Sequence, residues 1–193
     1  FAYACTAANG RRHHHKHSDR ALDLHSPNHG FFWSHMGWLM HPETYEVAFR
    51  ELRDLQRFPE LDWLDRFSWI PVLISFLFLW LVGAAWQGLS PGSIVTPLFV
   101  VFWGGILRTV LVWHMTWAVN SVCHRWGRVA FETGDESRNN LLIAVLTTGE
   151  GWHNNHHHAP SCARSGLGWQ QPDLAYGVIC LLERAGFVWD VRH

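Results

Sequence analysis

Residues 68–86 read SWIPVLISFLFLWLVGAAW, an apolar run of 19 residues that contains no charged side chain. A helix needs roughly 20 apolar residues to cross the hydrocarbon core of a bilayer. The run therefore predicts a membrane-spanning helix over residues 68–86. Pro71 falls in the first turn of this helix, where the missing backbone N–H removes no helical hydrogen bond.

A second apolar segment follows the short uncharged sequence QGLSPG. It starts at residue 93, continues past Arg108 and keeps its apolar pattern to His124. A helix of this length is longer than a bilayer is thick, so we expect a span over residues 93–115 and a C-terminal end outside the lipid. Because the charged residues lie on both flanks of the hairpin, the positive-inside rule places both flanks in the cytoplasm.

The two runs are also compatible with a pair of buried helices in a soluble α-helical protein, and the mean hydropathy of the chain, close to zero, mildly favours that alternative. We favour the membrane hairpin because polar flanks lower the average, while the first run is uncharged throughout. No segment shows the alternating pattern of a strand. The sequence therefore predicts an all-α fold, a membrane-embedded helical hairpin with a histidine-rich helical cap on the cytoplasmic side.

The segment before the hairpin, residues 41–69, carries apolar residues at nearly every third position from Leu52 to Phe67, with arginines and aspartates between them. Pro59 should divide it into two short helices. Such a strip suits a membrane interface and an ordinary protein surface equally well.

Composition limits the remaining possibilities. The chain has 193 residues, enough for one domain, and a net charge of −1, which provides no basic field for nucleic acid. Its four cysteines lack CxxC spacing, which indicates reduced thiols. The first ten residues, FAYACTAANG, begin without methionine and look like the end of an apolar helix, so we expect the chain to begin within a larger protein.

Fifteen histidines are the most unusual feature of the composition, and many of them lie in two clusters, RRHHHKHSD at residues 11–19 and GEGWHNNHHHAP at residues 149–160. In the second cluster, three histidines are spaced i, i+3 and i+4 from His153, so a helix would place them on one face. In the first, the adjacent His14 and His15 would diverge by about 100° on a helix, so each suits a different metal ion. Neutral imidazole is a ligand for zinc, copper, iron and nickel.

An adjacent histidine pair occurs in both clusters, which suggests a two-metal site with ligands from both segments. Asn120 and His124, spaced i and i+4 near the end of the long apolar helix, add a third contribution on the same side of the bilayer. Structural zinc is an alternative, but zinc sites usually have four ligands, often including cysteine. A redox metal beside a membrane suggests oxygen chemistry on a lipid-soluble substrate.

These motifs resemble those of the membrane fatty acid desaturases, specifically the acyl-CoA Δ9-type branch. That family has the boxes HxxxxH, HRxHHxxSD, NSxxH and GEGxHNxHH in this order. NSVCH at 120–124 and GEGWHNNHH at 149–157 match the last two, and RRHHHKHSD matches the second from Arg12 onward. The segment DLHSPNHGFFWSHMGWL at 23–39 resembles the family's DPHSPxxGFxxSHxGW stretch. The resemblance extends from residue 11 to residue 192.

The resemblance implies an acyl desaturase that places a double bond in a fatty acyl chain, with CoA as the expected carrier, using O₂ and two electrons at a histidine-ligated site of two iron ions. Carried over position by position, it implies that Asn120 reaches one iron through water and that Thr116 and Trp117 lie beside the bend of the acyl tunnel. No residue beyond the metal ligands is expected to be catalytic. The implied iron ligands are His14, His15, His124, His153, His156 and His157.

The chain departs from the family pattern in its N-terminal part. The HxxxxH box and two preceding spans are absent, and Arg11 stands where the second box begins with histidine. We therefore expect residues 1–193 to be a single, N-terminally truncated desaturase domain with the last two of four spans, which alone binds fewer than two irons and is inactive. His13 is an alternative source of the missing imidazole. The carboxylates that adjacency suggests as acceptors for the imidazole N–H groups are Asp19, Asp23, Glu136 and Glu150.

Two further functions are compatible with the same site: a lipid hydroxylase on the same di-iron scaffold, and a catalytically inactive desaturase remnant. The expected partners are a fatty acyl-CoA or other acyl carrier, O₂, the lipid bilayer and, because no haem or flavin motif is present, a separate electron-donor protein. We expect a multi-pass membrane protein of the bacterial cytoplasmic membrane, or of the endoplasmic reticulum in a eukaryote, with its active site on the cytoplasmic side.

Overall fold

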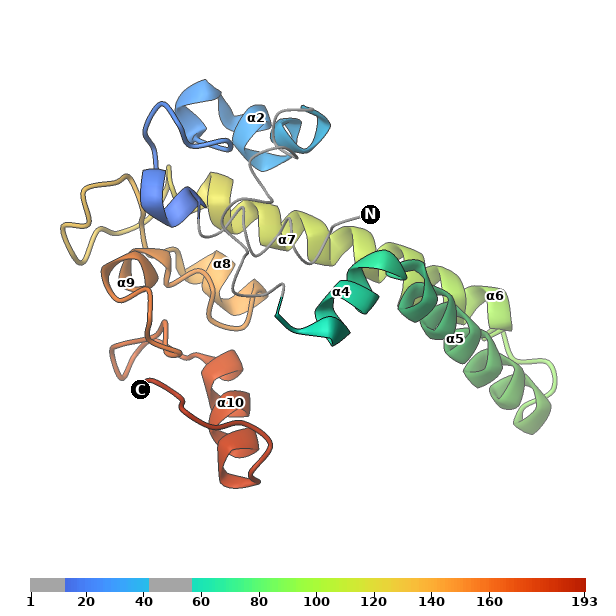
Figure 1. Cartoon of the computed structure of the whole chain (residues 1–193). Coiled ribbons are helices and arrows are strands. Elements are labelled where there is room, and N and C mark those ends of the chain that lie inside the picture. The colour runs from blue at the N-terminus through green and yellow to red at the C-terminus, as the bar shows by residue number, and fades with distance from the viewer. Residues whose placement is uncertain (1–12, 42–56) are drawn as a thin grey trace. The chain divides into compact units, whose positions relative to one another are not determined.

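The structure, a computed structural model, describes residues 13–41 and 57–193. Over these residues the chain forms helices and loops (Figure 1), and its only strand-like pairings are single bridges, Arg128 with Asn139 and Asn139 with Trp152. The predicted all-α fold is confirmed for this part of the chain. The described residues divide into two compact units, one of residues 57–114 and one of residues 13–41 and 115–193.

The first unit contains the apolar hairpin. Helix α5 (Trp69–Leu89) is followed by a continuous helix that consists of α6 (Pro97–Val100), the π-helical segment η4 (Val101–Leu107) and α7 (Arg108–Val122). Both helices are long and apolar enough to cross a membrane, and only 6% of the apolar window of each is buried within the structure. Apolar helices that expose nearly all of their surface suit contact with lipid better than the core of a soluble protein.

The second long helix begins at Pro97, four residues later than the apolar pattern predicted. The side chain of Thr96 accepts a hydrogen bond from the backbone N–H of Phe99, and proline occupies the first turn, where it fits the helix best. This cap ends the loop, although Ile94 and Val95 before it are apolar. The helix then continues to Val122, past residue 115, where only the membrane span was expected to end, and close to His124, where the apolar pattern ends.

Glycines allow the two helices of the hairpin to approach closely. Gly83 of α5 is buried, and a Cβ atom there would lie 2.6 Å from the Cα atom of Pro97. A Cβ atom at Gly105 of η4 would lie 3.1 Å from the ring of Phe76 and 3.3 Å from Leu79. Small residues at helix contacts are typical of membrane proteins, where close packing of the backbones replaces hydrophobic burial.

Helix α4 (Pro59–Arg66) precedes the hairpin and starts at the proline. The sequence predicted two short helices divided at Pro59. The helix that begins at Pro59 confirms the second helix of this pair. The N-terminal half of the predicted pair falls on residues 42–56, outside the described residues.

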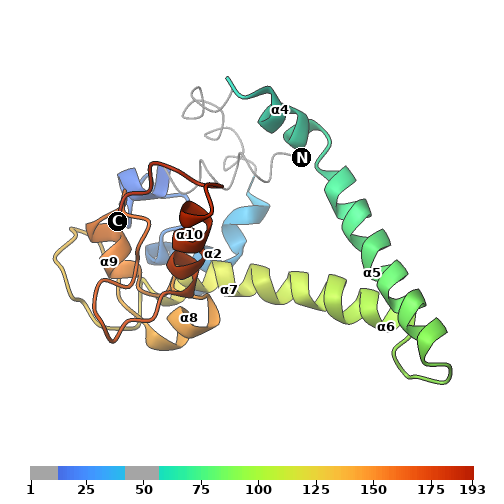
Figure 2. The ribbon, with the colours of Figure 1, turned by 90° about the horizontal axis from the view of Figure 1, so that it is seen from below.

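The second unit carries the histidine clusters. Its apolar core is small, consisting of Ala118, Val119, Cys123 and Ile143 with Val122 packed against them. The end of α7 lies between the helical residues 13–17 and helix α9 (Figures 1 and 2), and side-chain contacts connect all three. The other helices of this unit are η1 (Pro27–His29), α2 (Phe31–His35), η2 (Gly37–Met40), α8 (Leu141–Leu146), α9 (His153–His158) and α10 (Leu174–Arg184).

Candidate metal centre

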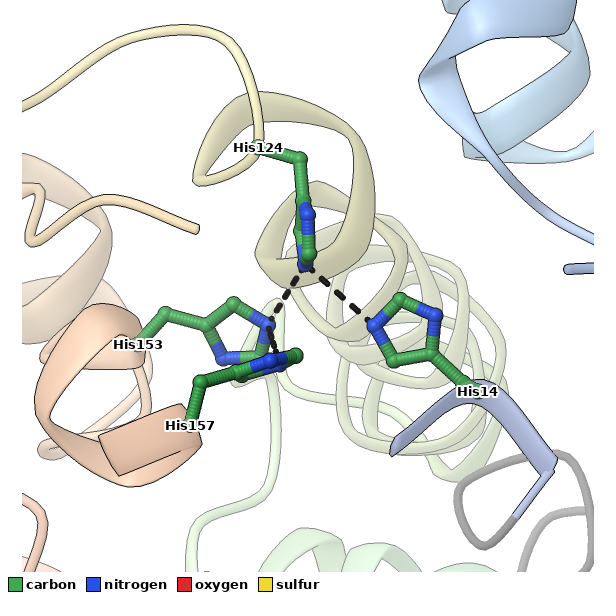
Figure 3. Close-up of side chains that lie close together, drawn as sticks. All are labelled: His14, His124, His153 and His157. Atoms are coloured by element: carbon green, nitrogen blue, oxygen red, sulfur yellow. Dashed lines mark hydrogen bonds between the residues drawn. The ribbon is translucent and has the colours of Figure 1, made fainter. Parts of the chain in front are cut away.

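Four histidines from three separate segments meet in the second unit (Figure 3). His124, directly after α7, is central: its Nε2 atom lies 3.3 Å from Nε2 of His14 and 3.1 Å from Nε2 of His153. His157 completes the set, with its Nε2 atom 3.1 Å from Nε2 of His153. We call His14, His124, His153 and His157 the four-histidine group. Their side chains are almost completely buried.

The local sequence explains why these rings converge. His153 and His157 are four residues apart on α9, so both rings leave the same face of the helix, as the spacing predicted. His124 follows the last turn of α7, and His14 belongs to the helical residues 13–17. Figure 3 shows the rings of these three segments pointing toward one another.

A second pair of imidazoles lies beside this group. The Nε2 atoms of His15 and His156 are 3.1 Å apart, and the ring centroid of His15 is 4.6 Å from that of His157. The adjacent His14 and His15 therefore face different partners, as expected from their angular separation on a helix. We call these two residues the His15–His156 pair.

Three buried carboxylates fix the orientation of the four-histidine group. Nδ1 of His14 lies 3.0 Å from Asp23, and Nδ1 of His124 lies 2.8 Å from Asp19. Nδ1 of His157 lies 2.6 Å from Asp135. Because an ionised carboxylate can only accept a hydrogen bond, each of these Nδ1 atoms donates its proton.

This hydrogen bonding tests whether the group fits a metal ion. A neutral imidazole that donates from Nδ1 has only a lone pair at Nε2, so His14, His124 and His157 direct lone pairs into one small space. Such an arrangement is repulsive unless a cation accepts the lone pairs. Nitrogen ligands bound to one ion at about 2.0–2.1 Å stand roughly 3 Å apart, which is close to the separations found here. The residues therefore fit a metal ion.

Burial keeps the rings of His153 and His157 in the neutral form that binds metals. Burial lowers the pKa of His153 well below its ordinary value, and the neighbouring rings of His157 and His124 lower it further. Burial also lowers the pKa of His157, and its hydrogen bond to Asp135 offsets only part of this effect. Both rings are therefore neutral at physiological pH.

Asp23 and Asp135 remain ionised although they are buried. Burial alone would raise the pKa of Asp23, but the hydrogen bond and charge of His14 outweigh it and hold the pKa well below the usual range. Burial likewise would raise the pKa of Asp135, and the hydrogen bonds from His157, Ser137 and Thr133 reverse the direction. Each carboxylate is thus a permanent acceptor for its imidazole.

We call Asp19, Asp23 and Asp135 the carboxylate layer. Adjacency in the sequence identified only part of it. Asp19 and Asp23 accept from imidazoles as expected, whereas Glu136 lies 3.4 Å from Arg138. The acceptor for His157 is the neighbouring Asp135, which sequence reasoning missed. A tight loop sets its direction, because Asp135 accepts hydrogen bonds from the hydroxyl of Thr133 and from the backbone N–H of Ser137. The predicted role of Glu150 stays a prediction.

His25 is a second residue that the sequence did not single out as a candidate. Its backbone N–H donates to Asp23, its Nδ1 atom lies 3.7 Å from that carboxylate, and its ring centroid is 4.4 Å from that of His14. Burial lowers the pKa of His25 to about 3, so its ring is neutral. The feature of the sequence that could have identified His25 is its position in the DLHSP segment, which is part of the family resemblance.

The other predicted residues lie around the group without a tested role. Asn120 precedes His124 by one turn on the same face of α7 and is half-buried. Trp117 is half-buried with its ring centroid 5.9 Å from that of His35, and Thr116 is exposed. The Nε2 atom of His13 lies 2.8 Å from the carbonyl oxygen of Leu22, so His13 is not part of the four-histidine group.

A polar cleft of about 530 Å³ borders the group. His124, Asp19 and Asp135 line it, together with Arg125, whose guanidinium donates to the carbonyl oxygen of Pro27. The cleft therefore borders two of the three carboxylates, Asp19 and Asp135, whereas Asp23 is not among the residues that line it.

The geometry defines a buried cluster of histidines that could hold a metal ion. The sequence model of the family described as "Fatty acid desaturase" matches residues 6–175, so the chain belongs to the fatty acid desaturase family. It is 40% identical over 185 residues to an acyl-CoA C20 Delta5-desaturase of Anemone leveillei, covering 94% of this chain and 55% of the relative. It is 40% identical over 182 residues to an sn-2 palmitoyl-lipid 9-desaturase of Nostoc sp. (strain 36), covering 92% and 59%. An sn-1 stearoyl-lipid 9-desaturase of Anabaena variabilis is 39% identical over 183 residues, covering 94% and 62%.

These comparisons confirm the family that the sequence motifs indicated. The chain spans little more than half the length of the first two relatives, so the activity of a whole desaturase does not transfer to it directly. Proteins named desaturases are oxidoreductases, and the four-histidine group of this chain could hold a metal ion.

The carboxylate layer leads to a direct test. Replacing Asp135 by asparagine should weaken Co²⁺ binding to the four-histidine group about 10- to 100-fold, because the amide cannot enforce the Nδ1–H tautomer of His157. Titration followed by visible absorption measures the affinity.

The matched control is Glu136→Gln, the neighbouring acid that adjacency had suggested. We expect it to leave Co²⁺ affinity unchanged, because the side chain of Glu136 contacts Arg138. Equal losses in the two variants would contradict the assignment of Asp135.

Proposed function

We propose that this chain carries the metal-binding centre of an acyl desaturase, which introduces a double bond into a fatty acyl chain with O₂ and two electrons. The observation that supports this most strongly is the convergence of four histidines from before and after the hairpin, three of which are oriented by a buried carboxylate. Membership of the desaturase family supplies the reaction class.

The proposed cofactor is a pair of iron ions. The four-histidine group is proposed to hold one, and the His15–His156 pair contributes to the second. Asn120 is proposed to reach one of them through water, because it lies on the face of α7 that ends at His124. Because Arg11 stands where the family's second box has a histidine, we expect the chain alone to retain fewer than two irons and to be inactive.

The metal supplies the oxidising power that removal of hydrogen from an unactivated methylene requires, because no protein side chain can supply it. The chain contributes orientation and a dry environment. Asp19, Asp23 and Asp135 fix the tautomer of three imidazoles, and burial keeps the rings neutral and excludes water from their Nε2 side. Dry surroundings also protect a strong oxidant from side reactions.

The proposed substrate is a fatty acyl chain. Thr116 and Trp117, on the turn of α7 before Asn120, are proposed to line the bend of its tunnel. The names of the relatives include both acyl-CoA and acyl-lipid desaturases, so the carrier is a question for product analysis. A separate electron-donor protein is proposed to deliver the electrons.

The proposed location is a membrane, bacterial or of the endoplasmic reticulum, with the metal centre on the cytoplasmic side. The two helices of membrane-spanning length support membrane association. The arrangement of residues 1–193 as a single desaturase domain with two spans is part of the same proposal.

Metal analysis tests the site. The 193-residue chain, purified in detergent and reconstituted anaerobically with Fe²⁺, should bind about one iron, and chelation should be slow because the ligands are buried. A chain that binds no iron would overturn the proposal. Two tightly bound irons would instead contradict the expectation that the second position is incomplete.

Lipid analysis tests the reaction. The chain is expressed in a host that lacks its own desaturase, and the acyl products are analysed by mass spectrometry. New monounsaturated chains would overturn the expected inactivity of the chain and establish desaturation, whereas hydroxylated chains would favour the lipid hydroxylase. Bound iron without any product agrees with the incomplete second position.

A further inference from the structure

Three asparagines are buried beside the four-histidine group, although amides are not among its expected ligands. Asn139 is 7% exposed, Asn154 is fully buried and Asn155 is 1% exposed. Buried amides are costly unless their donors and acceptors are all used. The hydrogen bonds of these three residues therefore indicate what they hold in place.

Asn139 fixes the first turn of α9. Its side-chain oxygen accepts the backbone N–H groups of Asn154 and Asn155 at 3.0 and 3.2 Å, and its amide nitrogen donates to the side chain of Asn155 at 2.7 Å. The first N–H groups of a helix have no partner within the helix, so an acceptor from another segment completes them. Trp152, which precedes α9, makes no such side-chain cap itself.

Asn154 forms hydrogen bonds with the loop that carries Asp135. Its side-chain oxygen accepts the backbone N–H groups of Ala130 and Phe131, both at 2.8 Å. Its amide nitrogen donates to the carbonyl oxygen of Phe131 at 3.0 Å and to the hydroxyl of Ser137 at 3.3 Å. One side chain thus holds both ends of the loop over residues 130–137.

These contacts close a ring of interactions around one metal-ligand candidate. Asn154 and His157 lie three residues apart on α9, and Asn154 holds the loop whose Asp135 accepts from Nδ1 of His157 at 2.6 Å. The backbone N–H of Ser137 and the hydroxyl of Thr133, both in this loop, also bind Asp135. Two sets of contacts therefore hold Asp135 near His157. One is the direct hydrogen bond between them, and the other is the set of hydrogen bonds from Asn154 to the loop that carries Asp135.

We propose that Asn154 is a positioning residue of the metal centre, which acts through Asp135 to hold His157 in its ligating orientation. The proposal rests on the metal-binding function proposed above. The amide is required because the site uses both its acceptor and its donors: aspartate would lose the donors and place a second charge near Asp135, and alanine would lose both.

A double-mutant cycle in Co²⁺ affinity tests this role with the full chain. Asn154→Ala should weaken Co²⁺ binding about 10- to 100-fold, as removal of a partner that orients a ligand does. If Asn154 acts through Asp135, the combination with Asp135→Asn should be no more than about threefold weaker than Asp135→Asn alone, because residues in one network are not additive. Losses that multiply in the double variant would overturn the proposal.

Two further variants separate positioning from folding. Ile143→Ala removes a buried side chain from the core of the same unit and should lower the thermal midpoint while Co²⁺ affinity stays within about threefold of wild type. Ser137→Ala removes one acceptor of the Asn154 amide and leaves the backbone intact, so it should fold and lose several-fold in affinity even if Asn154→Ala does not fold. An equal affinity loss in Ile143→Ala, or none in Ser137→Ala and Asn154→Ala, would overturn the proposal. A wild-type chain that fails to bind Co²⁺ would instead overturn the proposed function.

Discussion

Replacement of His124 by alanine is expected to abolish metal binding by the four-histidine group, with an affinity loss larger than the about 10- to 100-fold caused by changes in the surrounding carboxylate layer. His124 is the ring whose Nε2 atom lies near Nε2 of both His14 and His153, so its loss removes the central ring of the four-histidine group. It also leaves the buried carboxylate of Asp19 without its imidazole donor. Iron content after reconstitution and Co²⁺ titration measure the effect.

His158→Ala is the matched control. His158 is also a histidine of the second cluster, but its ring stacks on Phe131 at a centroid distance of 4.1 Å and it is not part of the four-histidine group. We expect its removal to leave iron content unchanged. Retention of iron by His124→Ala, with circular dichroism like that of the wild type, would contradict the assignment of the centre.

Gly151→Ala is expected to destabilise the second unit by about 3 kcal/mol or more, because the added methyl group has no space. A Cβ atom at this position would lie 2.0 Å from the backbone nitrogen of Ala144 in α8 and 2.6 Å from the carbonyl carbon of Ile143. Neither backbone atom can move without displacing α8, and the carbonyl oxygen of Gly151 accepts the N–H of Asn140, which caps that helix. The thermal midpoint should fall by roughly 6 °C or more.

The control is Gly177→Ala in α10, where no atom lies within 4 Å of the added Cβ. Alanine is the better helix former, so this variant should be neutral or more stable by up to about 1 kcal/mol. A thermal midpoint for Gly151→Ala within 2 °C of the wild type would show that α8 and α9 are not packed as described.

The metal centre illustrates where sequence patterns are sufficient. The spacing of His153 and His157 fixes their common face because helical geometry is local, and the structure places both rings together. The adjacency of His14 and His15 likewise predicted that they face different partners. The two helices of the hairpin followed from the length of their apolar segments. Only the start of the second helix, at Pro97, depended on a local cap that hydropathy does not reveal.

The carboxylate layer shows where sequence patterns fail. Asp135 and Glu136 are neighbours of the same charge, and nothing local distinguishes them as partners for an imidazole 21 or 22 residues away. A loop held by Thr133, Ser137 and Asn154 turns the first toward His157 and leaves the second with Arg138. The direction of a loop side chain depends on hydrogen bonds to distant segments, which the order of residues does not state.

By itself, the sequence determined that the chain is helical, that two of its helices have the length and composition to cross a membrane, and that its histidines belong to a desaturase-type centre. Those properties depend on composition and on spacing along single helices. Only the tertiary structure decided which carboxylate orients which ring, that His25 lies against His14, and that the buried Asn154 connects α9 to the loop of Asp135. These contacts join segments that are far apart in the chain, and burial selects them only after the helices have packed.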